Sequence, residues 1–194
     1  MMRVGLLADT HIPYRATSWS PGVLAALRGV DAILHAGDVD EPWALDALRE
    51  IAPVYAVRGN AHWFDGSSGG ASLPDVVRLA LEGFDVVVTH GHLRGWPGIY
   101  WRARMVARAL RRQWDFPAYD RVLVQQLLQR FPQADVIVFG HTHRFYTARV
   151  GQTLVINPGA ALATAYFGSP YPPSIAHLIL RADHIPQVRK ILCD

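Results

Sequence analysis

Short apolar runs recur along the chain, and each is bounded by glycine, proline or a polar turn residue. Runs of this length and content are typical of buried β-strands. In the first half they cover residues 3–8, 31–36, 54–57, 76–81 and 85–89. Apolar residues with helical spacing lie between the first three runs, at about residues 20–28 and 43–51. Ser20 and Pro21 suit the N-cap and the first residue of the earlier helix.

The second half returns to strand patterns after a long helical section between residues 93 and 131. Strand-like runs cover residues 136–140, 145–150, 153–156 and 174–181. Asn157, Pro158 and Gly159 predict a turn between the last two runs. Strand–helix alternation followed by neighbouring strands predicts an α/β fold in which two sheets pack together with helices outside. We expect one domain over residues 1–194, because no linker or internal repeat interrupts the pattern.

The residues that can bind a metal ion fall just after five of these strands. They are Asp9, His11, Asp38, Asn60, His90, His141 and His143. In α/β folds, ligands bind where the carboxyl ends of strands meet, so these side chains are expected to lie together. Each residue alone has a simpler interpretation as part of a turn. Their recurrence at one kind of position favours a metal site.

The chemistry of this set predicts which ions it holds. Mixed carboxylate, imidazole and amide ligands suit Mn²⁺, Fe²⁺, Zn²⁺, Co²⁺ or Ni²⁺ rather than Mg²⁺ or Ca²⁺. Manganese is the first expectation. Seven side chains are too many for one ion with an open position, whereas two ions about 3.5–4 Å apart that share a carboxylate accommodate them. The single cysteine, Cys193, excludes an intrachain disulfide and a cysteine-based zinc site.

Composition narrows the class of protein further. A hydrophobic content of 51% and a charged content of 18% indicate a globular chain rather than a disordered one. The formal charge of +3 comes mainly from arginine, since Lys190 is the only lysine, and it favours an anionic small-molecule partner. Because no stretch approaches the roughly 18 uninterrupted apolar residues of a membrane span, we expect a cytoplasmic protein without a membrane partner.

Five short motifs carry the candidate ligands. They are Asp9-x-His11, Gly37-Asp38, Gly59-Asn60, His90-Gly91-His92 and Gly140-His141-Thr142-His143, with Asn157-Pro158-Gly159 after the last. In order and spacing they resemble the calcineurin-like metallophosphoesterase family, and its small single-domain phosphodiesterases of bacteria and archaea in particular. The resemblance implies a four-layer α/β/β/α sandwich of two mixed sheets.

The resemblance also implies a role for each ligand. Asp9, His11 and His143 would hold a first ion, Asn60, His90 and His141 would hold a second, and Asp38 would bridge the two. A hydroxide shared by both ions would then attack the phosphorus of a phosphodiester. No serine or cysteine nucleophile is needed, and no motif for one is present.

The third motif departs from many relatives, which have a histidine directly after the asparagine that protonates the leaving group. Ala61 stands at this position. His62, one residue further, is a candidate replacement for that catalytic acid, and an exposed loop histidine is the alternative. His92, two residues after the ligand His90, is a candidate for contacting the substrate phosphate or orienting a ligand, with a structural role as the alternative.

Residues 93–119 form a helical insertion that is longer than expected for the small relatives. Ile99, Ala103, Val106 and Leu110 share one helical face, Arg104, Arg108, Arg111 and Arg112 share the opposite one, and Trp96, Tyr100, Trp101 and Trp114 surround them. Three interpretations are open. The helix docks on the core through its apolar face, it caps the site and binds anionic or nucleobase groups, or it makes a homodimer contact.

These features predict a metal-dependent phosphoric ester hydrolase whose substrate is a small phosphodiester or a nucleotide. A nuclease is one rival, but the repair nucleases of this superfamily carry extra domains and a histidine after the asparagine motif, so nucleic acid is the less expected partner. A non-catalytic scaffold is the other, as in the retromer subunit of the same fold, which has lost metal-site histidines. The seven ligand positions are all filled in this chain, which favours the enzyme.

Overall fold

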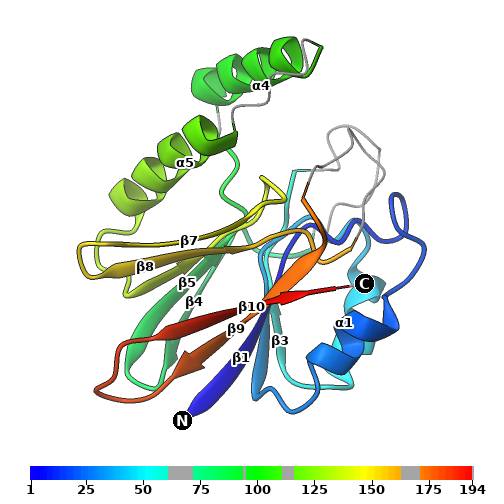
Figure 1. The fold of residues 1–194 in the computed structure, drawn as a ribbon, viewed down its shortest axis with the longest axis vertical. Helices are drawn as coiled ribbons and strands as arrows, with labels where there is room; N and C mark the ends of the chain where they lie inside the picture. Colours follow the sequence, from blue (N-terminus) through cyan, green and yellow to red (C-terminus); the bar gives the residue numbers. More distant parts are fainter. Residues whose placement is uncertain (61–71, 94, 111–115, 163–170, 194) are drawn as a thin grey trace.

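The structure is a computed structural model that describes residues 1–60, 72–93, 95–110, 116–162 and 171–193. Its framework is two five-stranded sheets packed face to face (Figure 1). The first sheet has the strand order β10-β9-β1-β2-β3 and the second has the order β4-β5-β6-β8-β7. Both sheets mix parallel and antiparallel neighbours, as expected for the α/β fold.

In the first sheet, β1 (Met2–Leu7), β2 (Ala32–His35) and β3 (Val54–Ala56) are parallel. The antiparallel strands β9 (Ser174–Leu180) and β10 (Gln187–Leu192) complete it on the far side of β1. Strand β10 is absent from the predicted pattern. It lies at the edge of the sheet with four of its six residues exposed, so it lacks the continuous apolar run that marks a buried strand.

In the second sheet, β5 (Phe84–Thr89), β6 (Val136–Val138) and β8 (Thr153–Pro158) are parallel. Strand β4 (Val76–Leu81) pairs with β5 through a tight turn at Glu82 and Gly83, and β7 (Phe145–Val150) pairs with β8. Asn157 and Pro158 are the last residues of β8, and the turn begins with Gly159, which has a φ of 84°.

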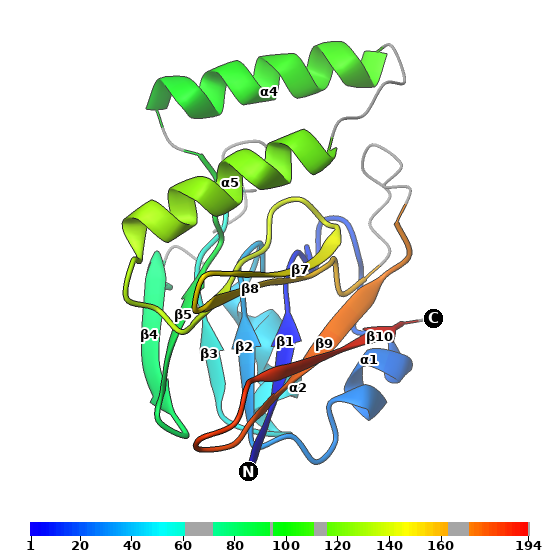
Figure 2. The same cartoon turned by 60° about the vertical axis from the view of Figure 1, so that its left-hand side comes forward.

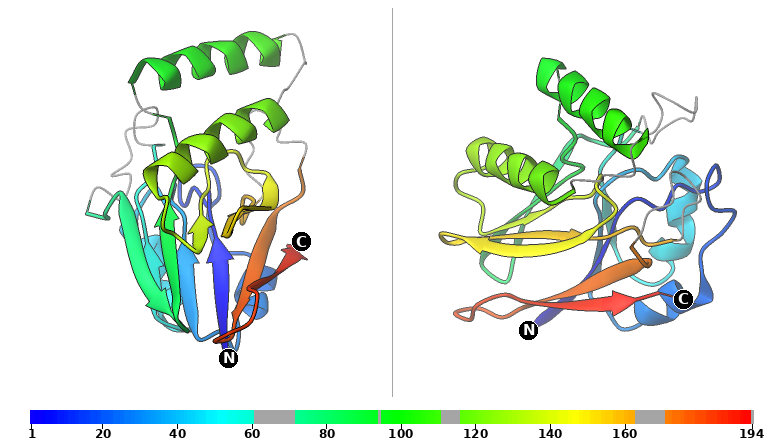
Figure 3. Two further views of the ribbon diagram at one scale, coloured as in Figure 1. Left: turned by 90° about the vertical axis from the view of Figure 1, so that its left-hand side faces the viewer. Right: turned by 45° about the horizontal axis from the view of Figure 1, so that its top comes forward.

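The helices cover the outer faces of the two sheets and complete a four-layer α/β/β/α sandwich (Figure 2). Helix α1 (Pro21–Ala26), the 3₁₀ helix η1 (Pro42–Leu45) and α2 (Asp46–Arg49) lie on the first sheet. The Ser20 side chain caps α1 by accepting a hydrogen bond from the Gly22 N–H. On the second sheet lies α5 (Phe116–Arg130), and α4 (Gly95–Leu110) packs outside α5 (Figure 3).

Alternating side chains of the central strands fill both faces of each sheet, because both faces are covered. Leu6, Leu34, Val86, Val136 and Ile156 are fully buried between the sheets. Their neighbours along the strands point the other way: Leu7 and Ile33 pack under the helices of the first sheet, and Val87 and Ile137 pack under α5. Among the described residues, no helix has the length and hydropathy needed to cross a membrane.

The interpretation in which the helical insertion docks on the core through its apolar face is wrong for the residues whose side chains can be compared. Ile99 is 58% exposed and Ala103 is exposed, whereas Arg104 and Arg108 are half-buried. Trp101 sets this orientation by packing on α5, and the Arg104 guanidinium lies 5.3 Å from the centroid of the Trp101 ring. The apolar stems of arginine side chains tolerate such burial, so charge alone did not identify the outer face. Arg111, Arg112 and Trp114 lie outside the described residues.

Candidate metal centre

The parallel strands place the candidate ligands at one end of the sandwich, where the two sheets meet. Strands β1, β2 and β3 of the first sheet lead to Asp9 and His11, to Asp38 and to Asn60. Strands β5 and β6 of the second sheet lead to His90, and to His141 and His143. Each sheet therefore supplies part of the site, as expected for ligands at the carboxyl ends of parallel strands.

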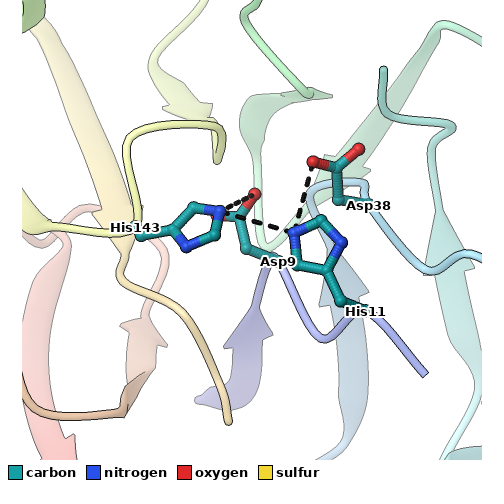
Figure 4. Close-up of side chains that lie close together, drawn as sticks. All are labelled: Asp9, His11, Asp38 and His143. Atoms are coloured by element: carbon teal, nitrogen blue, oxygen red, sulfur yellow. Dashed lines mark hydrogen bonds and ion pairs between the residues drawn. The ribbon is translucent and has the colours of Figure 1, made fainter. Parts of the chain in front are cut away.

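Four of these residues form a compact cluster, shown in Figure 4. One potential ligand atom from each of Asp9, His11, Asp38 and His143 lies within 4.8 Å of the others. The Nε2 atoms of His11 and His143 are 3.4 Å apart, and His143 Nε2 is 3.7 Å from Asp9 Oδ1. Asp9, His11 and Asp38 are buried. A buried set of two carboxylates and two imidazoles with converging donor atoms fits a divalent transition-metal ion.

Asp38 connects this cluster to a second group of predicted ligands. Its Oδ2 atom lies 3.5 Å from His11 Nε2 and 3.4 Å from His90 Nε2. His90 Nε2 is also 2.9 Å from the Asn60 side-chain oxygen. The ring centroid of His141 lies 5.2 Å from that of His90. The structure thus brings all seven predicted ligand residues to one place.

Hydrogen bonds from outside the cluster fix which ring nitrogen of two histidines faces inward. His11 Nδ1 is 3.1 Å from Oδ1 of Asp40, and His90 Nδ1 is 2.8 Å from the carbonyl oxygen of Ala36. When each Nδ1–H donates to these acceptors, Nε2 keeps its lone pair for an ion. The sequence prediction did not include Asp40. Its local signal is a second carboxylate two residues after Asp38, but its partner His11 is 29 residues away.

His141 is held differently, by a residue of the helical insertion. Its Nε2 atom is 2.8 Å from the hydroxyl of Tyr119 on α5, which the sequence prediction also missed. Its backbone N–H donates to the Asp9 carboxylate at 3.0 Å. The ring of His92 lies beside these ligands, with its centroid 5.7 Å from that of His90 and 6.3 Å from that of His141. Ala61 and His62 lie outside the described residues.

The backbone around the site has unusual conformations for residues with side chains. Positive φ values occur at Asp9, His11, Asp38, Asp40, His141 and His143. Such conformations cost about 1 kcal/mol each and concentrate at functional sites. Two glycines permit close approach: a Cβ on Gly59 would overlap Asp38, and one on Gly37 would lie 2.6 Å from His90 Nδ1. These loop conformations therefore lower local stability, and they bring the ligand side chains together.

Burial and neighbouring charges shift the pKa values of three candidate ligand histidines in different directions. Burial lowers the pKa of His143 below its usual value, and burial with the nearby charge of His90 lowers the pKa of His141 further. Burial would lower the pKa of His90 as well, but the charge and hydrogen bond of Asp38, the charge of Asp9 and the Ala36 carbonyl raise it to about 9. His90 must therefore lose a proton before Nε2 can bind an ion.

One cation of the chain lies at the edge of the first cluster. Arg15 Nη1 is 3.1 Å from His11 Nε2, the nitrogen that also faces Asp38 and His143. The segment after His11 turns back on itself, with the Arg15 N–H bonded to the His11 carbonyl at 2.9 Å, and this turn aims Arg15 at the site. The sequence prediction did not single out Arg15. This residue lies four positions after His11, in a segment that has neither a strand nor a helix pattern.

Comparison with known proteins identifies the family. The sequence profile of the calcineurin-like phosphoesterase superfamily domain matches residues 2–179. The chain belongs to this family. Among its relatives is a probable metallophosphoesterase of Methanothermobacter thermautotrophicus, which is 32% identical over 163 residues, 82% of this chain and 77% of that protein. A phosphodiesterase of Methanocaldococcus jannaschii is 20% identical over 172 residues, 81% of this chain and 83% of that protein.

Solved structures share the fold of this calcineurin-like phosphoesterase. Wild-type Vps29 of Entamoeba histolytica in complex with Zn²⁺ superposes with a TM-score of 0.67 at 22% sequence identity. The match covers 98% of this chain and 99% of that one. At this identity the likeness establishes the fold, which agrees with the predicted sandwich.

Proposed function

We propose that the chain is a two-metal-dependent phosphoesterase that hydrolyses a phosphodiester. Asp9, His11 and His143 would hold one ion, Asn60, His90 and His141 would hold the other, and Asp38 would be shared. The observation that carries this proposal is the position of Asp38, whose Oδ2 atom lies within 3.5 Å of a ligand nitrogen of each group. Family membership supports the hydrolytic class of reaction.

The chemistry divides between the ions and the protein. A pair of divalent cations, when bound, lowers the pKa of water and neutralises the charge of a phosphate group. The chain orients the rings of His11 and His90 through Asp40 and the Ala36 carbonyl, and burial favours the neutral form of His141 and His143. Arg15 and His92 border the ligands and would contact phosphate oxygens. His62 stays a candidate for protonating the leaving group, from the segment outside the described residues.

The preferred substrate class and the preferred ion follow from the relatives and from the ligand set. A diester is the preferred substrate class, because a relative of matching length is named a phosphodiesterase. Manganese is the proposed ion, although the mixed ligand set also suits iron, zinc, cobalt or nickel, and a structure with the same fold was solved with Zn²⁺. A small diester or nucleotide is the proposed partner, without nucleic acid or a membrane.

A non-catalytic scaffold is the second candidate, because several structures with the same fold are Vps29 proteins. The ligand geometry argues against it. A scaffold that only presents a surface to binding partners does not require such strained loops. In this chain six non-glycine residues around the buried carboxylates and histidines have left-handed conformations.

The deciding experiment measures metal content and hydrolysis on one preparation. The purified protein is loaded with Mn²⁺, its bound metal is counted, and cleavage of bis(p-nitrophenyl) phosphate is compared with cleavage of the monoester. Close to two ions per chain with the diester preferred is the expected result. Bound metal without turnover would favour the scaffold. A protein that binds no metal and shows no turnover would contradict the proposal.

A further inference from the structure

The loop of residues 140–144 carries the proposed ligands His141 and His143. Hydrogen bonds from two parts of the protein hold this loop in place. On the side of the second sheet, the Asn157 side-chain amide donates to the Gly140 carbonyl at 2.8 Å and to the Thr142 hydroxyl at 3.1 Å. On the opposite side, two consecutive residues near the beginning of α5, Tyr119 and Asp120, contact the same loop. The second set of contacts comes from α5, where the helical insertion of residues 93–119 ends, rather than from the sheets.

Tyr119 determines how His141 can act as a ligand. The phenol oxygen is 2.8 Å from His141 Nε2, and the Tyr119 side chain is only 7% exposed. An imidazole has two nitrogens, so a hydrogen bond at Nε2 leaves Nδ1 as the atom available to an ion. In that tautomer Nε2–H donates to the phenol oxygen, as ligand histidines commonly donate their second N–H to an outer partner.

Asp120 holds the rest of the loop. Its buried carboxylate accepts a hydrogen bond from Nε of Arg144 at 2.7 Å. Thr142 and Arg144 flank His143 directly in the sequence. Tyr119 therefore restrains the loop at His141, and Asp120 restrains it directly after His143, so the two contacts lie beside proposed ligands of both ions.

The outer helix supports this contact in turn. The ring centroid of Trp101 on α4 lies 5.3 Å from that of Tyr119, with 41° between the planes. The Arg104 guanidinium lies over the Trp101 ring, 5.3 Å from its centroid. A continuous set of packed side chains thus runs from α4 through Tyr119 to a ligand of the metal centre.

We propose that Tyr119 and Asp120 are positioning residues of the metal centre, and that Tyr119, the last residue of the helical insertion, connects the insertion to the site. This inference rests on the proposed role of His141 and His143 as ligands. It assigns the insertion a function that neither a solvated helix nor a substrate cap requires. Loss of the Tyr119 hydroxyl should weaken the ion bound by His141 while leaving the other ion in place.

The test is Tyr119→Phe, which removes the hydroxyl and keeps the ring that packs on Trp101. Mn²⁺ and Co²⁺ are titrated calorimetrically into the metal-depleted protein, and the unfolding temperature is measured alongside. The expected result is a loss of about 10–100-fold in affinity for one binding step, with the other step and the unfolding temperature unchanged. Tyr100→Phe, on α4 with a 60% exposed side chain, is the matched control and should bind as the wild type does.

The outcomes separate this inference from the proposed function. Two ions bound by the wild type and by Tyr119→Phe with equal affinities would overturn the positioning role and leave the phosphoesterase intact. A wild type that binds no ion would remove the proposed function, and this inference with it. Asp120→Asn tests the second contact and should weaken both binding steps, because its target loop carries ligands of both ions.

Discussion

Asp38 is the residue on which the two-ion arrangement depends. Oδ2 faces His11 and His90, while Oδ1 accepts the backbone N–H of Asn60 at 2.7 Å. Asp38→Asn keeps the shape and an acceptor for Asn60 but removes the charge that two cations would share. We expect the bound metal to fall below two ions per chain and diester hydrolysis to fall by at least about 100-fold, since even outer-shell ligand partners are worth 10–100-fold. Metal analysis and initial rates measure both effects.

The matched control for Asp38→Asn is Asp46→Asn on α2. The Asp46 side chain is 67% exposed and pairs with Arg49, and exposed pairs of this kind contribute little. The control should keep wild-type metal content and turnover. If Asp38→Asn also kept both, the shared-ligand role would be wrong. If it lost metal but retained turnover, the hydrolysis would not depend on this centre.

Arg15 carries a separate prediction about substrate binding. Its guanidinium lies 3.1 Å from His11 Nε2, so a cation bound there would repel it toward a phosphate group, the natural partner of a guanidinium. Charged hydrogen bonds are worth about 1.5–3 kcal/mol, so Arg15→Gln should raise KM for the diester and Ki for inorganic phosphate by roughly 10–150-fold. Metal content should not change, and Arg49→Gln, exposed on α2, should have no effect. Unchanged KM and Ki would show that Arg15 does not meet the phosphate.

The sequence alone identified the proposed ligands but not the residues that orient them. Ligands such as Asp9 and His141 follow apolar runs, and this local signal survives without knowledge of the fold. Asp40 and Tyr119 act on histidines 29 and 22 residues away, through contacts that exist only after the sheets and helices pack. No spacing rule connects such pairs, so only the structure identifies them.

At the scale of elements, the helical section formed by α4 and α5 is the main addition to the two-sheet framework. Arg104 and Arg108, which a substrate cap would direct at an anionic substrate, are half-buried, and Arg104 lies on Trp101. The double variant Arg104→Gln/Arg108→Gln should therefore leave KM for thymidine 5′-(p-nitrophenyl phosphate) unchanged. Loss of the contact with Trp101 should lower the free energy of unfolding by about 0.5–1 kcal/mol. Chemical denaturation and steady-state kinetics distinguish these effects, and an increased KM would restore the cap.

Most strands were recognised from their apolar runs, including the partly exposed edge strands β4 and β7, whose predicted bounds match the structure. The central strands β1, β2, β5 and β6 were recognised within two residues at each end. The exposed edge strand β10 was missed. The face of α4 was assigned from apolar spacing, but Trp101 dominates its docking because one aromatic ring buries more surface than several small side chains. The homodimer contact of this helix stays a prediction.

At the scale of the whole molecule, the proposed centre lies where the two sheets of the sandwich meet. Asp9, His11, Asp38 and Asn60 come from the first sheet, and His90, His141 and His143 come from the second. Ions held between them would tie the two sheets together at one end. Around the same place the left-handed residues and the buried carboxylates oppose folding. The site should therefore be the part of the fold whose stability depends most on metal.

Metal binding should consequently raise the thermal stability of the protein. An ion at 100 times its Kd stabilises the native state by about 2.7 kcal/mol. For a chain of this size each kcal/mol shifts Tm by about 2–4 °C, so Mn²⁺ should raise Tm by roughly 5–11 °C over protein in EDTA. Scanning calorimetry measures the shift, and Asp38→Asn should lose most of it while Asp46→Asn keeps it. Equal Tm values in Mn²⁺ and EDTA for the wild type would mean that no ion links the two sheets, and the two-metal proposal would fail on thermodynamic grounds alone.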